Sequence, residues 1–259
     1  MFLKAERLGN FVLLSKNIRF IDRIKTIFKK RFITTSIILN KKTFTYTDSL
    51  SFMTMYNEIF QKRIYDYNSD EPIPVIYDCG SNIGLSVIFF KLLYPEAELH
   101  AFEPDPEIFK ILSSNMTDYG FNNLHLHQNA VWKNEELLSF SSQGGSSGKI
   151  IDQDSPIKVK AIRLSEWLTK KVDFLKIDIE GAEFEVLKDC ALVLHNVKNM
   201  FIEYHSFIDE EQFLDEILLI IKKAGFKYYI QHETSSRSPF IQIKTIGSMN
   251  AQLNLFCYR

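Results

Sequence analysis

The chain has 259 residues, of which 46% are hydrophobic and 24% charged, and its formal net charge is −1. This composition is typical of a soluble globular protein with one large domain, and it excludes collagen-like and disordered chains. A net charge so close to zero gives no whole-chain attraction to nucleic acid. The three cysteines are widely spaced and form neither a disulfide framework nor a metal-ligand motif, so we expect a reducing, cytoplasmic location.

Residues 1–70 are predicted to form a small helical and β appendage. Apolar residues recur at helical spacing between basic ones over residues 17–31. We favour an amphipathic helix with a solvated basic face, and the alternative is contact with a membrane surface or an anionic partner. A hairpin over 32–46 and a helix over 48–67, capped by Asp48 or Ser49, should follow. We expect no signal peptide and no membrane span.

From residue 71 to 259 strands and helices alternate, which predicts an α/β domain, a doubly wound and mostly parallel seven-stranded sheet. The expected strands are 75–78, 98–103, 124–131, 174–179, 199–204, 226–231 and 253–258. The expected helices are 83–93, 106–119, 165–171, 182–190 and 210–224, with an inserted hairpin over 137–140 and 157–161. Because no helix separates the last two strands, they should pair antiparallel.

The first strand of this domain leads into a glycine turn, Asp78-Cys79-Gly80-Ser81-Asn82-Ile83-Gly84. Gly80 would let the backbone turn sharply and let a ligand approach, and Gly84 would pack the next helix closely on the strand. The free N–H groups of that helix would point at the ligand. The spacing lacks the middle glycine of G-x-G-x-x-G, which clears space for a pyrophosphate. This argues against an NAD-dependent oxidoreductase.

Glu103 lies at the carboxyl end of the second strand, 19 residues after Gly84. An acid at that position can accept hydrogen bonds from both hydroxyls of a ribose. The alternative is an ordinary surface acid before Pro104. Together with the glycine turn, Glu103 predicts a crevice for a nucleoside-containing ligand, and we expect this crevice to be built entirely from residues after Ile73.

The fourth strand carries Lys176, Asp178 and Glu180 in alternation, which places them on one face. Such a row is costly to bury unless it is paired, so we expect it at the carboxyl end, open to the same crevice. The fifth strand adds Glu203 and His205, and histidine can exchange a proton near neutral pH. We predict Lys176, Asp178, Glu180 and His205 as catalytic, against the alternative of a structural ion pair.

These motifs, with Phe102-Glu103-Pro104 and the run Lys176-Ile177-Asp178-Ile179-Glu180-Gly181-Ala182-Glu183, resemble the FkbM family of S-adenosylmethionine (SAM)-dependent methyltransferases over about residues 73–226. Ser81 and Cys79 stand where the family often has alanine and valine. The resemblance implies the class I methyltransferase fold, with strand order 3-2-1-4-5-7-6, and SAM as cofactor. It also places Asn129 and Ala130 at the adenine edge. The predicted cofactor-binding residues are Asp78, Gly80, Asn82, Gly84, Glu103, Asn129 and Ala130.

The reaction that the resemblance implies is O-methylation of a sugar, glycan or polyketide-like molecule. A base near the acceptor hydroxyl would assist the transfer. A divalent metal held by Asp178, Glu180 and either Glu203 or His205 is a less favoured alternative. Two further hypotheses are an RNA or other nucleic-acid methyltransferase, which only the basic N-terminal segment favours, and a non-catalytic SAM-binding module. We expect no nucleic-acid partner.

Overall fold

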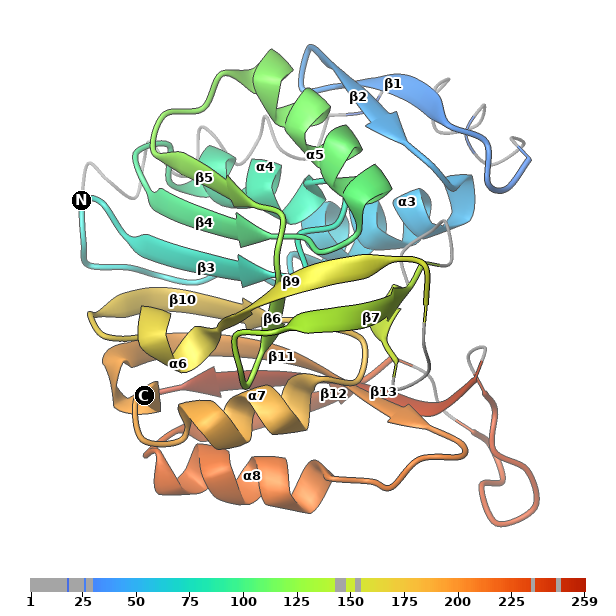
Figure 1. The fold of residues 1–259 in the computed structure, drawn as a ribbon, viewed down its shortest axis with the longest axis vertical. Helices are drawn as coiled ribbons and strands as arrows, with labels where there is room; N and C mark the ends of the chain where they lie inside the picture. The colour runs from blue at the N-terminus through green and yellow to red at the C-terminus, as the bar shows by residue number, and fades with distance from the viewer. Residues whose placement is uncertain are drawn as a thin grey trace.

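The computed structural model describes residues 30–142, 148–151, 155–233, 236–245 and 248–259, together with Ile18 and Thr26. Seven strands of this described part form one sheet in the order β12-β13-β11-β10-β3-β4-β5 (Figure 1). Their bounds are β3 Val75–Cys79, β4 Glu98–Phe102, β5 Leu124–His127, β10 Val172–Ile177, β11 Val197–Phe207, β12 Lys227–His232 and β13 Met249–Tyr258. Only β13 runs antiparallel to both of its neighbours. The predicted order and the antiparallel final pair are confirmed.

Helices cover both faces of this sheet, because successive residues of each central strand face opposite layers. On β10, Phe174 packs in the core with helix α4, whereas Leu175 packs in the core with α7 and α8. The helices are α4 Leu85–Leu93, α5 Pro106–Tyr119, α6 Leu164–Trp167, α7 Glu183–Cys190 and α8 Leu214–Lys223, with a short 3₁₀ turn at Leu194–Asn196. The fold is therefore the doubly wound α/β class.

Helix α5 shows how local chemistry sets the boundaries of an element. The side chain of Asp105 accepts hydrogen bonds from the N–H groups of Glu107 and Ile108, and Pro106 occupies the first helical position. Gly120 ends the helix in the left-handed conformation, where a side chain would be strained. Both predicted ends of this helix are confirmed.

The N-terminal segment shares the hydrophobic core of the large sheet. Its elements are β1 Thr35–Leu39, β2 Lys42–Tyr46, α3 Ser49–Tyr56 and a π-helical turn over Asn57–Lys62. Asp48 caps α3, as predicted, and also pairs with Arg31. A run of aromatic rings connects Tyr56 to Phe60 at 5.1 Å and Phe60 to Phe89 of α4 at 5.7 Å. Residue 70 is therefore no break in the hydrophobic core.

Asn115 of α5 joins the N-terminal hairpin to the glycine turn. Its buried amide donates to the carbonyls of Thr45 and Ile83, both at 2.9 Å, and its oxygen accepts from the N–H of Thr45. A buried amide whose NH₂ group and oxygen are both hydrogen-bonded fixes the position of its neighbours. The turn after β3 is consequently held from two directions.

A second, four-stranded sheet is inserted between β5 and α6. Its strands are β6 Ala130–Trp132, β7 Leu137–Ser141, β8 Lys149–Ile150 and β9 Lys158–Arg163, in the order β6-β9-β7-β8. The predicted hairpin is present, but the single strand predicted over 124–131 is wrong. The ladder to β4 ends where the N–H of Glu103 donates to His127, because Pro104 follows, and Ala130 then pairs with β9.

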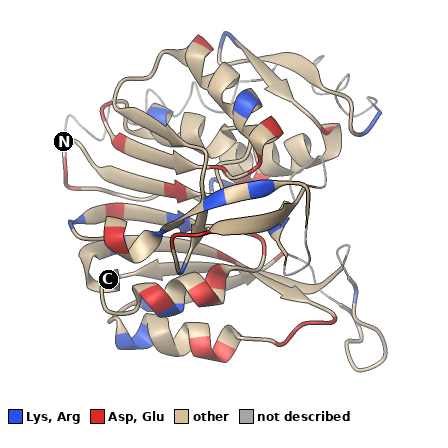
Figure 2. Ribbon diagram, in the orientation of Figure 1, with Lys and Arg blue, Asp and Glu red and all other residues tan. Residues whose placement is uncertain are grey.

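Charges on the inserted sheet are complemented by α7. Figure 2 shows Lys and Arg along β9 and Asp and Glu along α7. Arg163 pairs with Asp189 at 2.6 Å, and Lys133 pairs with Glu185 at 2.7 Å. These pairs neutralise part of the basic surface that a nucleic-acid ligand would need.

Several further boundaries differ from prediction. The helix predicted over 48–67 is α-helical only to Tyr56 and ends after the π-helical turn, and α6 ends at Trp167 and not at 171. Helix α8 begins at Leu214 and not at 210, and β13 begins at Met249 and not at 253.

Strand β10 ends at Ile177, so the alternation invoked for Glu180 does not reach it; Glu180 and Gly181 instead have positive φ, at 54° and 101°. Strand β11 continues to Phe207, because β13 pairs along it as far as Met249. Most of the predicted basic helix lies outside the described residues. Among the described helices, none has the length and apolar character needed to cross a membrane.

Candidate active site

The turn after β3 needs glycine at position 80 because of a neighbouring backbone. A Cβ built on Gly80 would lie 1.8 Å from the carbonyl oxygen of Asp178, and its φ is +88°. The predicted sharp turn is present, with its positive φ, and the carbonyl of Asp178 is a further constraint that the sequence did not indicate. The close approach of two strand ends brings the glycine turn and the predicted catalytic residues to the same place.

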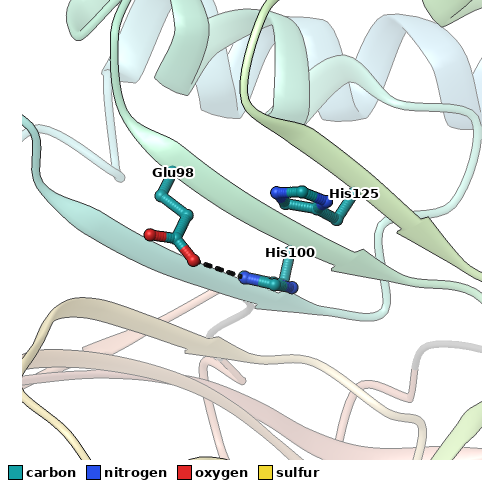
Figure 3. A group of neighbouring side chains, drawn as sticks. All are labelled: Glu98, His100 and His125. Atoms are coloured by element: carbon teal, nitrogen blue, oxygen red, sulfur yellow. Dashed lines mark hydrogen bonds and ion pairs between the residues drawn. The ribbon is translucent and has the colours of Figure 1, made fainter.

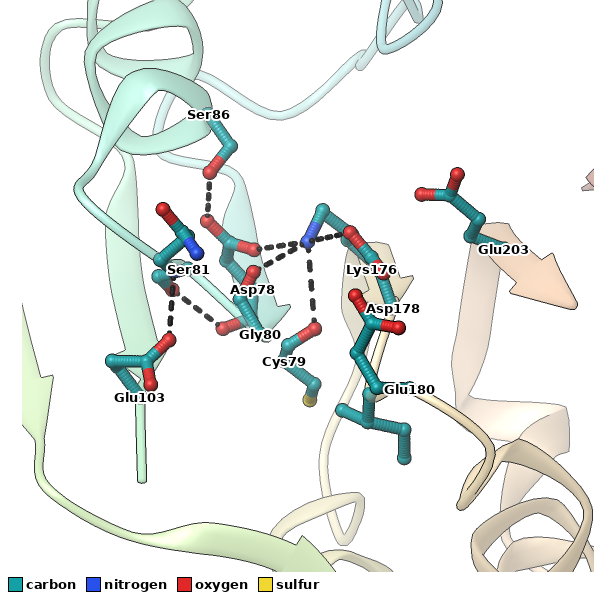
Figure 4. Close-up of polar contacts among 12 residues, drawn as sticks. Asp78, Cys79, Gly80, Ser81, Ser86, Glu103, Lys176, Asp178, Glu180 and Glu203 are labelled. Carbon is teal, nitrogen blue, oxygen red and sulfur yellow. Dashed lines mark hydrogen bonds and ion pairs between the residues drawn. The ribbon is translucent and has the colours of Figure 1, made fainter. Parts of the chain in front are cut away.

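Lys176 is buried and fully engaged. Its Nζ donates to the carbonyl of Gly80 at 2.8 Å and pairs with Asp78 and Asp178, both at 3.2 Å (Figure 4). Burial alone would lower the pKa of Lys176, but Asp178 and Asp78 raise it well above its usual value. The side chain is a permanent cation that joins β3 to β10, which fits the predicted role of holding the acids.

Glu103 fastens the turn from the other side. One carboxylate oxygen accepts from the N–H of Asn82 at 3.0 Å, and the other accepts from the N–H of Asp105 at 2.9 Å. Burial raises the pKa of Glu103 to about 8, against the opposing effect of these hydrogen bonds. Each carboxylate oxygen has a second lone pair, so Glu103 keeps acceptor capacity for a ligand.

A cavity of ≈320 Å³ opens between this turn and the ends of β10 and β11. Of the predicted residues, its walls include Gly80, Asn82, Glu103, Asn129, Ala130, Lys176, Asp178, Glu180 and His205. Asp78 and Gly84 lie outside the lining. Asp78 is buried behind the turn, where it accepts from Ser86 Oγ at 2.6 Å. We predicted that Gly84 would pack closely on the strand. A Cβ on Gly84 would instead meet Met116 and Leu112, so its close contact is with α5.

The N-terminal segment supplies one wall of the cavity, which corrects the prediction that the crevice is built only from residues after Ile73. Because the π-helical turn after α3 packs on α4, α3 and the residues that follow it bring side chains that sequence patterns gave no reason to select. They are Leu50, Ser51, Thr54, Met55, Glu58, Ile59 and Tyr65. The inserted sheet contributes another wall through Phe140, Gly148 and Ile150.

His205 is surrounded by three carboxylate side chains. Its Nδ1 lies 3.0 Å from Glu183, and its Nε2 lies 3.7 Å from Glu180 and 4.0 Å from Asp178. Burial alone would lower the pKa of His205, but Glu183, Glu180 and Glu203 raise it well above its usual value. The ring is therefore an imidazolium near neutral pH. Glu183 had no predicted role, although it belongs to the same sequence run.

The acids of the cavity repel one another. Burial, followed by Asp178 and Glu183, raises the pKa of Glu180 to about 7. Burial and Glu233 raise the pKa of Glu58 to about 7 as well. A carboxyl group with a pKa near the working pH is suited to accept a proton. Glu58, from the N-terminal wall, was missed because nothing in its local sequence sets it apart from a surface helix acid.

Asp178, Glu203 and His205 could together hold a divalent cation. Each offers one ligand atom, and these atoms lie within 4.8 Å of one another. Each residue also has one polar atom committed to the protein, to Lys176, Gln252 and Glu183 respectively. Such outer partners orient the ligands of metal sites. The geometry fits a metal ion, but it fits the ion pairs equally well.

Comparison with known proteins identifies the family. The methyltransferase FkbM domain model matches residues 78–228. The chain belongs to this family. It is 30% identical over 162 residues to methyltransferase 1 of Beauveria bassiana, covering 52% of this chain and 65% of that protein. It is 26% identical over 212 residues to the 31-O-demethyl-FK506 methyltransferase FkbM of Streptomyces tacrolimicus, covering 66% of this chain and 80% of that protein.

A solved structure supports the fold. The methyltransferase FkbM of Methylobacillus flagellatus aligns with a TM-score of 0.50 at 14% identity, covering 96% of this chain and 59% of that one. The FkbM domain is thus built on a class I, Rossmann-like sheet. The matched region includes the glycine turn, Glu103 and the row from Lys176 to His205, whereas the N-terminal wall of the cavity lies outside it.

Proposed function

We propose that this protein transfers a methyl group from SAM to a hydroxyl oxygen of a small molecule or glycan. The observation that carries the proposal is that one cavity joins two sets of groups. The glycine turn with Glu103 forms one end, and Asp178, Glu180 and His205 form the other. A methyltransferase needs a cofactor end and an acceptor end that meet in one enclosed space.

SAM suits the first end by its chemistry. Glu103 would accept from the two ribose hydroxyls, while Asn129 and Ala130 would border the adenine. The turn lacks the glycine that makes room for a pyrophosphate, and SAM contains none. SAM also carries a sulfonium, and the carboxylates of Asp178, Glu180 and Glu203 on the cavity wall favour a positive charge in a site shielded from water.

The second end suits a hydroxyl acceptor. In the proposed step the hydroxyl oxygen forms a bond to the methyl carbon and the sulfonium–methyl bond breaks, leaving S-adenosylhomocysteine as a neutral thioether. The hydroxyl proton passes to Glu180 or Asp178. Because His205 is already charged, it attracts the carboxylate of Glu180 as an ion pair and does not act as the base. Lys176 keeps Asp178 in place.

The acceptor class is a proposal that rests on the relatives. The Streptomyces relative is named for a 31-O-demethyl substrate, which supports methylation at oxygen. In this protein the N-terminal wall combines apolar Leu50, Met55 and Ile59 with polar Ser51 and Thr54. A mixed wall of this kind fits a hydroxylated molecule with apolar faces, such as a sugar or a polyketide-like compound.

Calorimetry with SAM, S-adenosylhomocysteine and NADH tests the cofactor. We expect one molar equivalent of SAM or S-adenosylhomocysteine to bind and NADH to give no signal. NADH binding without SAM binding would overturn the proposal. A metal-assisted form of the same reaction makes a separate prediction: turnover would stop in EDTA and return with Mg²⁺.

A further inference from the structure

A cluster of three histidines and one glutamate lies on the large sheet, away from the cavity. Strands β4 and β5 are parallel neighbours, and their register pairs His100 with His125 and Phe102 with His127. Because side chains alternate along a strand, Glu98, His100, His125 and His127 all share one face. The alternating residues Leu99 and Leu126 face the opposite layer, in the core with α4 and α5.

The side chains of this cluster are close enough to share one ion. His100 Nε2 lies 3.1 Å from a carboxylate oxygen of Glu98, and His100 Nδ1 lies 3.1 Å from His127 Nε2 (Figure 3 shows the first contact). The ring of His125 stacks on that of His100 with centroids 4.6 Å apart. Glu98, His100 and His125 each offer one ligand atom, and these atoms lie within 4.8 Å of one another.

The hydrogen-bond pattern around His100 has two solutions. A neutral imidazole carries one N–H. If Nε2–H donates to Glu98, Nδ1 accepts from His127 and the chain is complete without an ion. If Nδ1–H donates to His127, the lone pair of Nε2 and the carboxylate of Glu98 face each other, and a cation between them satisfies both. In the second solution His127 fixes the ring of its neighbour, as outer partners do in metal sites.

Aromatic neighbours fix the orientation of the His100 ring. The ring of His100 is packed edge-on against Tyr77 at 5.1 Å and Trp167 at 5.6 Å, so its orientation is preset.

We propose that Glu98, His100 and His125 bind one Zn²⁺ ion, with water in the remaining position. Two imidazoles and one carboxylate form a ligand set that zinc accepts, whereas magnesium prefers oxygen ligands alone. Glu98 and His100 lie five and three residues, roughly 16 and 10 Å of strand, before Glu103, and none of the three proposed ligands lines the cavity. The site is therefore separate from the methyl-transfer cavity.

The ion would bridge two strands of the large sheet. β5 is the edge strand of the large sheet, bonded on one side only to β4. A metal ion bridging the two strands would fasten this edge. Two residues after β5, the chain reaches Asn129 and Ala130 in the cavity wall, so the ion would also steady that wall.

The test is a zinc titration of the chelator-treated full chain against a chromophoric competitor. We expect one tight equivalent and a higher melting temperature with zinc. His125→Ala should abolish the tight equivalent, and because His125 is exposed, the variant should stay folded. His127→Ala should weaken zinc binding roughly 10- to 100-fold. His195→Ala, which removes an exposed imidazole elsewhere, is the matched control and should bind as the wild type does.

Asp178→Asn separates this site from the carboxylates of the cavity, and it should leave the tight equivalent unchanged. Co²⁺ gives a second readout, since visible absorption bands of the bound ion should appear with the wild type and vanish with His125→Ala. The proposal is overturned if the wild type takes up no tight zinc, or if His125→Ala binds it as tightly as the wild type.

Discussion

Replacing Glu103 by alanine tests the cofactor end of the cavity. In the proposal, the carboxylate accepts from two ribose hydroxyls, and hydrogen bonds to a charged group are worth roughly 1.5–3 kcal/mol each. The pKa of Glu103 is raised to about 8. Ionising it at pH 7 therefore costs about 1.4 kcal/mol. Taking the lower value for both bonds, the loss is roughly 3 − 1.4 = 1.6 kcal/mol, about fifteenfold in Kd.

Calorimetric titration with SAM measures this loss. The wild type should also bind SAM more tightly as the pH rises from 7 towards 8, because hydrogen-bond donors of the ligand favour the ionised carboxyl group of Glu103. Glu103→Ala should lack this part of the pH dependence. Titration of the ligand itself is common to both proteins and cancels in the comparison. A SAM affinity within twofold of wild type in Glu103→Ala would refute the reasoning.

Glu107→Ala is the matched control, since Glu107 is exposed on α5, four residues after Glu103, and pairs only with Lys110 among the ion pairs of the described residues. Thermal unfolding must accompany the titration. Glu103→Ala leaves the buried N–H groups of Asn82 and Asp105 without their acceptor, which should lower the free energy of unfolding by about 1–3 kcal/mol for each group. Binding is then compared at a temperature where both proteins are folded.

Three further predictions concern the turn, the base and the metal. Gly80→Ala should lower the free energy of unfolding by more than about 3 kcal/mol, because its Cβ would meet the carbonyl of Asp178. Gly120 has open space around it, so Gly120→Ala should lower the free energy of unfolding by only about 1 kcal/mol in the same denaturant titration. Glu180→Gln should lower kcat roughly 10²-fold and leave SAM affinity unchanged. The wild-type rate should rise as the pH passes upward through about 7, because the carboxyl group of Glu180 then loses its proton. EDTA should leave turnover unchanged if the ion pairs alone do the chemistry.

Each of these predictions has a clear contrary result. Equal stability of Gly80→Ala and Gly120→Ala would mean that the approach of Asp178 is looser than described. A Glu180→Gln enzyme with near-full kcat and an unaltered pH profile would make Glu180 structural. Loss of turnover in EDTA, with recovery in Mg²⁺, would show that Asp178, Glu203 and His205 act as metal ligands.

The large sheet could be predicted because its signals are local. Apolar strands ending in Asp78 and Glu103, caps such as Asp105 and stops such as Gly120 are each read from a few neighbouring residues. The antiparallel final pair was predicted from the missing helix between the last two strands, whereas the strand order was predicted from the resemblance to the FkbM family, and both are confirmed. Boundaries that depend on a partner were not predictable: β11 is long because β13 lies beside it.

The candidate site was predictable only in part. Sequence runs indicated the residues at the strand ends, but the N-terminal wall comes from contacts between segments far apart in the chain. Met55 and Glu58 reach the cavity because aromatic rings pack α3 and the turn after it onto α4. The role of Gly84 was misjudged for a similar reason, because its close neighbour, Met116, is 32 positions away. The charge on His205 depends on three carboxylates, of which Glu183 had no predicted role.

The central claim is that one cavity holds SAM and a hydroxyl acceptor, and transfer of labelled methyl groups tests it most directly. The full chain is incubated with methyl-labelled SAM and fractions of small molecules, glycans and RNA, with Glu103→Ala as the matched control. We expect label in a small-molecule or glycan fraction, in a bond that withstands mild alkali as a methyl ether does, and much less label with the variant. Label only in RNA, or no transfer to any fraction by a protein that binds SAM, would contradict the account.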